Sequence, residues 1–127
     1  MLVATGEAYI SGRIDAGQNP FTGTIYMGLS TDSTAPASTD TAVPGEQTAN
    51  GLGRQAVTAT HTSGTKLWTT AATFTYTGNT PNAPVNIVKL LTWDAPTGGN
   101  LITEDIISLA SFSVAGDNGS FQAQFKV

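Results

Sequence analysis

The chain has 127 residues and a mass of 13.0 kDa, a size that fits one domain with a modest core. Its net charge of −4 and its few, scattered basic residues argue against a nucleic-acid-binding protein, which clusters lysine and arginine against phosphates. Cysteine is absent, so disulfides and thiolate metal sites are excluded. Hydrophobic residues make up 39% and charged residues only 11%, which favours a folded β protein over disorder. The basic residues are Arg13, Arg54, Lys66, Lys89 and Lys126.

The N-terminal segment Met1–Gly23 is interpreted as an extended arm or a first strand. Its start, MLVATGEAYI, lacks a cationic region followed by a secretory core, and nothing in the chain approaches the roughly 18 apolar residues of a membrane span. We therefore expect a soluble protein that is not exported.

The next segments alternate between strand and loop patterns. Thr24–Leu29 alternates apolar and polar residues and predicts a strand. Ser30–Asn50 has no periodicity and two prolines, so it predicts a long loop: either an arm lying on a neighbouring subunit or a mobile surface loop. Arg54–His61 predicts a thin peripheral strand. Leu67–Thr77 predicts a strand with one apolar face and one threonine face.

The segment Val85–Ile102 predicts a central strand followed by a sharp turn. Strand periodicity places Val85, Ile87, Leu91 and Trp93 on one face and Val88 and Leu90 on the other, so both faces are partly apolar. The run Asp94–Asn100 then enforces a reversal through its proline and paired glycines.

The C-terminal third completes the strand pattern. Leu101–Phe112 alternates imperfectly and is read as a strand with a bulge, the alternative being a short helical turn opened by Thr103-Glu104-Asp105. Asn118-Gly119 is a turn signal, and Ser120–Val127 alternates as a last strand. No convincing helix is evident. These elements predict an all-β fold, an antiparallel β-sandwich of jelly-roll or immunoglobulin-like type or a closed barrel, in one domain over Thr24–Val127.

Candidate catalytic residues are few. His61 is the single histidine and is expected to be exposed or hydrogen-bonded rather than a zinc ligand or a base. Two carboxylates could serve a glycosidase, but spacing selects no pair, and turn or capping roles are favoured. The carboxylates are Glu7, Asp15, Asp32, Asp40, Glu46, Asp94, Glu104, Asp105 and Asp117.

Three binding readings are weaker. Asp94 and Asp117-Asn118 could offer oxygens to calcium, but no known spacing accompanies them and turn roles are favoured. Trp93 is expected in the core, whereas Trp68 could contact a sugar or a subunit. Asn118-Gly119-Ser120 matches a glycosylation sequon, which means little without export. We therefore assign no catalytic, cofactor-binding or metal-ligating residue.

The order of several motifs resembles a family of small virion structural proteins of tailed bacteriophages. The likeness covers Ile25–Val127. The chain has a Gly-Leu-Ser element at Gly28–Ser30, and it keeps the turn DAPTGGNL at Asp94–Leu101; it departs at Leu52-Gly53, where an aromatic-Ala pair is expected before Arg54. The other matching pieces are the Pro/Thr-rich loop, TAATFTY at Thr70–Tyr76, VNIVKLLTW at Val85–Trp93, and AGDNGSFQAQFKV at Ala115–Val127.

The resemblance implies a β-sandwich that assembles on a virion, made in the host cytoplasm, with no catalytic residues. Our main expectation is a capsid decoration (cement) protein on the capsid surface, a homo-oligomer with a trimer favoured, bridging the major capsid protein. Met1–Gly23 and Ser30–Asn50 are the expected contact segments. The alternatives are a tail fibre or baseplate-associated module and a carbohydrate-binding module.

Overall fold

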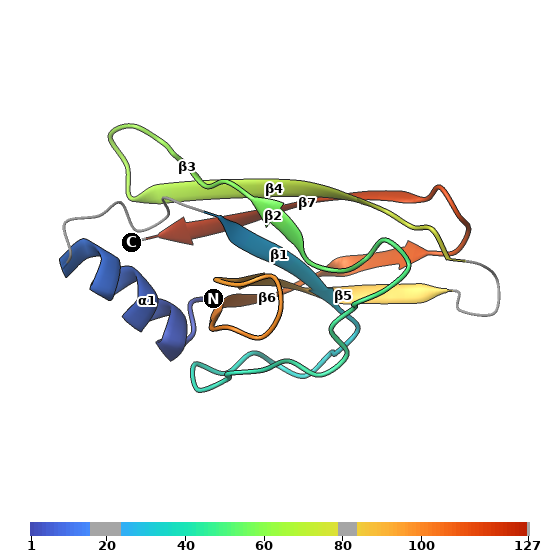
Figure 1. Ribbon diagram of the computed structural model, residues 1–127, viewed down its shortest axis with the longest axis horizontal. Coiled ribbons are helices and arrows are strands. Elements are labelled where there is room, and N and C mark those ends of the chain that lie inside the picture. Colours follow the sequence, from blue (N-terminus) through green and yellow to red (C-terminus); the bar gives the residue numbers. More distant parts are fainter. Residues whose placement is uncertain (16–23, 79–83, 127) are drawn as a thin grey trace.

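A computed structural model describes residues 1–15, 24–78 and 84–126 and shows two antiparallel sheets packed face to face (Figure 1). One sheet has the strand order β2-β1-β5-β6 and the other the order β3-β4-β7. The predicted all-β sandwich is therefore confirmed. The elements are α1 (Ala4–Asp15), β1 (Ile25–Ser30), β2 (Gln55–Val57), β3 (Thr60–His61), β4 (Leu67–Thr75), β5 (Val85–Trp93), β6 (Leu101–Phe112) and β7 (Asn118–Lys126).

Strand β5 is central, as its apolar sequence predicts, because it pairs with β1 on one side and with β6 on the other. The predicted division of its side chains is wrong. Ile87 and Leu90 lie in the core between the sheets, whereas Leu91 and Trp93 lie in a separate cluster on the outer face. The register with β6 shifts between Ile87 and Lys89, and such an irregularity reverses which face later residues occupy.

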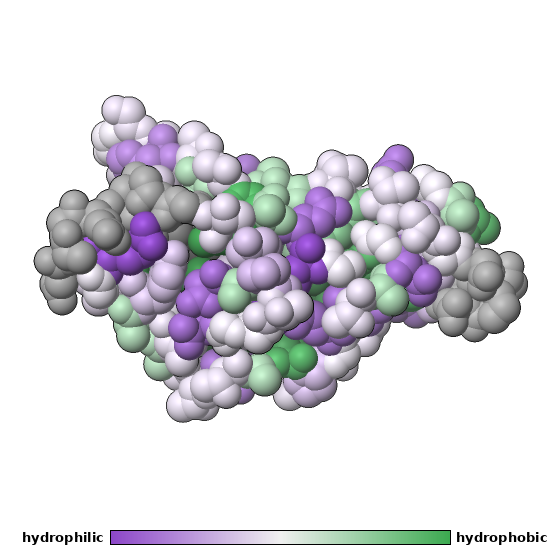
Figure 2. Space-filling view, in the orientation of Figure 1, coloured by the Kyte–Doolittle hydropathy of each residue, from purple (hydrophilic) through white to green (hydrophobic). Residues whose placement is uncertain are grey.

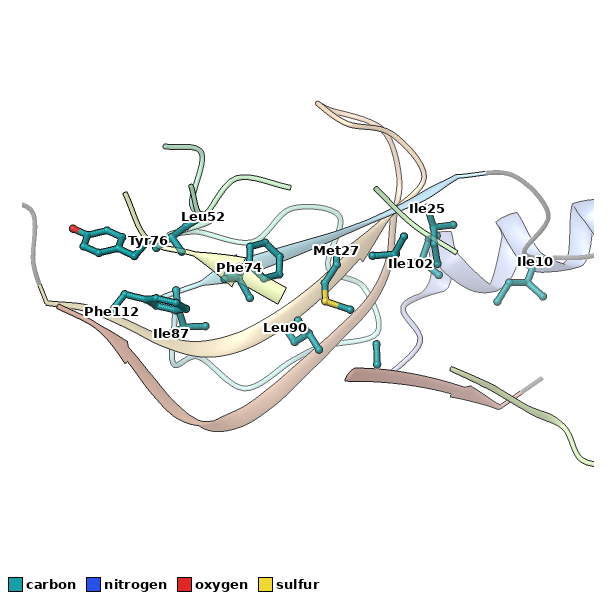
Figure 3. Close-up of a cluster of buried hydrophobic side chains, with 13 residues drawn as sticks. Ile10, Ile25, Met27, Leu52, Phe74, Tyr76, Ile87, Leu90, Ile102 and Phe112 are labelled. Carbon is teal, nitrogen blue, oxygen red and sulfur yellow. The ribbon is translucent and has the colours of Figure 1, made fainter. Parts of the chain in front are cut away.

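The main core fills the space between the two sheets (Figure 3). Strand β4 contributes to it as its alternation predicts: Phe74 and Tyr76 are buried, and the threonines beside them are exposed. Ile25, Met27 and Leu29 of β1 are also fully buried, from the opposite sheet. A simple period of two therefore accounts for this part of the fold.

The N-terminal segment corrects the sequence interpretation. Residues Ala4–Asp15 form a helix, not an extended arm or a first strand; residues 16–23 lie outside the described part. The helix packs on the start of β6 and inserts Ile10 into the main core (Figure 3). Gly6 permits this approach, since a Cβ there would lie 2.2 Å from the carbonyl oxygen of Ile102. Tertiary contact thus supports a helix whose own apolar pattern is weak.

Three smaller expectations meet different outcomes. Arg54–His61 is peripheral as predicted, but it divides into β2 and β3, which belong to different sheets. Leu101–Phe112 is a strand with an irregular register, not a helical turn. Asn118-Gly119 does not form the reversal: both residues open β7, and the turn lies just before them, with Gly116 at φ 99°. None of the described helical residues forms a segment long and apolar enough to span a membrane.

Candidate functional site

The long loop 30–50 is folded against its own sheet, in the blue-green trace below β1 and β5 of Figure 1. It is irregular, as predicted, but neither free nor extended. The Ser30 hydroxyl donates to the Pro44 carbonyl at 2.7 Å, and the Gln47 amide donates to the Leu29 carbonyl at 2.8 Å. Two groups of charged side chains then fix the loop to the outer face of the four-stranded sheet, and these groups are the candidate site.

The first group, the Lys89 cluster, consists of Lys89, Asp32, Asp40 and Glu104. The Lys89 ammonium, on β5, donates to Asp32 Oδ2 in the loop at 2.7 Å and to Glu104 Oε2 on β6 at 3.0 Å. Both Lys89 and Glu104 side chains are only 1% exposed. Buried charges need partners of opposite sign, and here the loop supplies one of them.

Proton affinities in this cluster diverge. Burial acts to lower the pKa of Lys89, but its hydrogen bonds to Asp32 and Glu104 outweigh burial and raise this pKa above its ordinary 10.5. Burial, and then the contact with Asp40, raises the pKa of Glu104 above 4.5. The same contact holds the pKa of Asp40 below 3.8. Glu104 Oε1 meets no donor, so its contact with Asp40 becomes a hydrogen bond only when Glu104 is protonated.

Two carboxyls with opposite pKa shifts beside a cavity also resemble an acid–base pair. The cavity, of about 320 Å³, is lined by Asp32, Asp40, Lys89 and Glu104 together with small loop residues. However, Lys89 stays protonated at neutral pH and is bound to carboxylates on two sides, so it offers no nucleophile. The pairing within the chain accounts for these residues as a clamp on the loop.

The second group, the Arg54 cluster, joins the loop to the turn after β5. The Arg54 guanidinium, from the segment before β2, forms a two-pronged ion pair with Glu46 of the loop, with N–O distances of 2.7 and 2.9 Å. Its Nη1 donates to the carbonyls of Ala95 and Gly98 at 2.9 and 2.8 Å. The guanidinium carbon also lies 3.8 Å from the centroid of the Trp93 ring, a cation–π contact.

The motifs that carry the phage resemblance meet at this arginine. Gly28, of the Gly-Leu-Ser element, leaves room for Glu46, because a Cβ there would lie 2.6 Å from Glu46 Oε2. Arg54 follows the departing Leu52-Gly53 pair, and Leu52 is buried in the core. The turn Asp94–Leu101 presents the two carbonyls that Arg54 binds. Motifs far apart in sequence thus build one contact network.

Beneath the loop lies a small apolar cluster that joins the two charged groups. Its buried members are Val3, Val43, Leu91, Trp93 and Leu101. Val43 comes from the loop and Val3 from the segment before α1. Trp93 is 4% exposed, as the core expectation for this residue requires.

The other candidate residues have local roles. His61 is exposed, with a ring nitrogen 2.7 Å from the Thr65 carbonyl, and its ring lies 4.8 Å from that of Trp68, which is half-buried. Asp94 accepts from the Asn100 amide at 2.6 Å, and Asp117 accepts from the Ser113 amide at 2.8 Å, so both are turn residues. The Ser113 and Val114 amides lower the pKa of Asp117.

The remaining carboxylates stay apart from the clusters. Glu7 is exposed on α1, Asp105 lies on β6, and the side chain of Asp15 is outside the described part. Within residues 1–15, 24–78 and 84–126, no three acidic or histidine side chains form a group suited to a metal ion.

Sequence reasoning missed Lys89 and Arg54 as organising residues. A lysine inside the apolar run VNIVKLLTW was the available signal, since a charge in a central strand needs a buried partner. No such signal names Asp32, Asp40 or Glu46 as the partners.

The fold and its clusters define a β-sandwich structural protein whose charged groups serve to hold its own loop. Residues 14–125 match the family model described as podophage GP4 fiber I protein gp80, and the chain belongs to this family. No curated protein matches the chain. The expected tailed-phage virion structural protein is therefore confirmed, and the protein is a virion component.

Proposed function

We propose that the protein is a non-enzymatic structural component of a podophage fibre. The observation that supports this is the family match, which covers all seven strands of the described sandwich and is named for a fibre protein. Among the readings from sequence, it favours the tail fibre or baseplate-associated alternative over capsid decoration.

The structure is compatible with a load-bearing module. Its long loop is tied to the sheet by the Lys89 and Arg54 clusters, so the longest irregular segment adds little compliance. Figure 2 shows a surface of mostly weakly polar residues, with small charged and apolar areas interspersed. Such a surface suits a protein that works by contact with other virion proteins and not by chemistry on a substrate.

Copy number in purified virions separates fibre from shell. Quantitative mass spectrometry against the portal protein and the major capsid protein should give a few to a few dozen copies for a fibre. Hundreds of copies, in proportion to the major capsid protein, would instead support the decoration reading, in which that protein is the partner.

Antibody labelling supplies the position that copy number lacks. Gold-labelled antibody against the exposed turn at Lys66 should mark fibres projecting from the particle in negative-stain images. Label spread evenly over the heads would overturn the proposal. Sugar binding at Trp68 stays a separate prediction, tested on a glycan array with the Trp68→Ala variant beside the wild type.

A further inference from the structure

The two sheets present strand edges of very different length. The edge strands β2 and β3 have three and two residues, whereas β6 and β7 have twelve and nine. The two long edges lie on the same side of the sandwich, where β6 contacts β7. Long edges present rows of backbone donors and acceptors that can pair with another chain, and monomeric proteins usually shield them.

The first part of β6 is shielded by the chain itself. Leu2 forms an antiparallel bridge with Thr103; the Val3 amide donates to the Ile102 carbonyl at 3.1 Å, and the Glu104 amide donates to the Met1 carbonyl at 2.9 Å. This bridge shows that the β6 edge accepts an added strand. From Ile106 to Phe112, no described residue pairs with the side of β6 that faces away from β5.

The uncovered part of β6 also carries the most exposed apolar side chains of the sandwich. Leu109 is 62% exposed and Ile106 is 51% exposed. The segment Ile106–Phe112, IISLASF, contains no charged residue and no proline, which are the usual devices against edge pairing. An unprotected edge of this kind is expected where the strand is covered in the assembled state.

We propose that two copies of this chain pair through this uncovered part of β6, antiparallel and across a two-fold axis near Leu109. Antiparallel pairing across a two-fold axis places the same segment opposite itself, which requires a self-complementary sequence. Here the neutral segment satisfies that requirement, although each chain carries a net charge of −4. The contact joins two four-stranded sheets into one continuous sheet.

The charge pattern favours a copy of this chain over an oppositely charged partner. A basic partner would be expected to meet an acidic edge, but the acidic residues Glu104 and Asp105 precede the uncovered segment, and Glu104 is held by Lys89. With the axis near Leu109, Asp105 lies opposite the neutral residues that follow Phe112. No like charges therefore face each other across the pair. The inference holds whether the virion places the protein on a fibre or elsewhere.

The oligomeric state of Leu109→Lys tests the proposal. Sedimentation equilibrium should show a dimer for the wild type, and Leu109→Lys should weaken it by roughly tenfold or more, because the two lysines would meet at the axis. The matched control, Ala71→Lys, adds the same charge at an exposed position of β4 and should leave the dimer unchanged. A monomeric wild type, or a dimer or trimer that survives Leu109→Lys, would overturn the proposal.

A disulfide trap gives a second measurement that does not depend on folding of the lysine variant. The natural chain has no cysteine, so Leu109→Cys can form a disulfide only between copies. Mild oxidation should convert this variant into covalent dimers and leave Ala71→Cys monomeric on non-reducing gels. Equal crosslinking of the two variants would show random collision and contradict the two-fold contact.

Discussion

The two faces of the four-stranded sheet are built by different physics. The inner face packs Met27, Ile87 and Leu90 against the second sheet, with only apolar side chains in its cluster. The outer face combines a small apolar cluster with the Lys89 and Arg54 clusters, under the irregular loop 30–50. Apolar packing is non-directional, whereas ion pairs demand particular partners at particular distances.

The difference separates what stabilises the sandwich from what positions the loop. Removing charges from water costs free energy that their mutual attraction only partly returns, so buried ion pairs are weak sources of net stability. Their partners are specific, however, and Lys89 and Arg54 each bind a carboxylate of the loop. We infer that the inner face supplies most of the folding free energy and the outer face fixes the loop.

The largest effect is expected from a cavity in the inner core. Phe74 is fully buried and packs edge-on against Phe121 at 5.8 Å between ring centroids. Phe74→Ala should lower the free energy of unfolding by about 3–5 kcal/mol, measured by urea denaturation. The exposed neighbour Thr73→Ala should change it by less than about 1 kcal/mol. Similar losses for both variants would mean that the inner face is not the main source of stability.

Removal of Lys89 is expected to come next. Lys89→Ala leaves Glu104 buried without its cation and should cost about 3 kcal/mol. The double variant Lys89→Met with Glu104→Gln removes both buried charges and should recover most of that loss. In both cases hydrogen exchange at the amides of loop 30–50 should speed up relative to the strands. If the double variant is as unstable as Lys89→Ala, the cluster contributes more than charge compensation.

Arg54 should sharpen the contrast, since its loss is expected to loosen the loop more than it destabilises the sandwich. Arg54→Lys keeps the charge but loses the two-pronged ion pair with Glu46, and it should cost roughly 1.5 kcal/mol. Hydrogen exchange should rise at residues 44–48 and in the turn 95–98. Unchanged exchange in both segments would contradict the role of Arg54 as the link between them.

The smallest effect is a pH dependence that belongs to the outer face. Glu104 has a pKa raised above 4.5, so the folded state binds more protons there and stability should fall as pH rises through the window above 4.5. Asp32 and Asp40 have pKa values below 3.8, so their contribution is lost as pH falls below that value.

Matched variants assign the two slopes. Glu104→Gln should flatten the slope of unfolding free energy above pH 4.5, and Asp32→Asn should reduce the acid loss below pH 3.8. Phe74→Ala should shift the whole curve and leave both slopes in place. A Glu104→Gln curve parallel to that of the wild type would place the titration elsewhere.

Local sequence patterns predicted the inner half of the protein. The alternation of Phe74 and Tyr76 with threonines, and the two-sided apolar character of Val85–Trp93, were sufficient for a sandwich with a central β5. The order of motifs pointed to a tailed-phage structural family, which the family match confirms. The helix Ala4–Asp15 escaped prediction because its stability comes from contact with β6 and from Ile10 in the core, not from a strong pattern of its own.

The outer face was decided by tertiary structure alone. A register shift in β5 turned Leu91 and Trp93 away from Ile87, and strand periodicity cannot anticipate an irregularity that depends on pairing with β6. Asp32 and Lys89 are 57 residues apart in sequence, and Arg54 and Gly98 are 44 apart. The sequence by itself determined which residues are apolar, charged or turn-forming; only the folded sheet brought distant charges within hydrogen-bonding distance, because such pairs have no local signature.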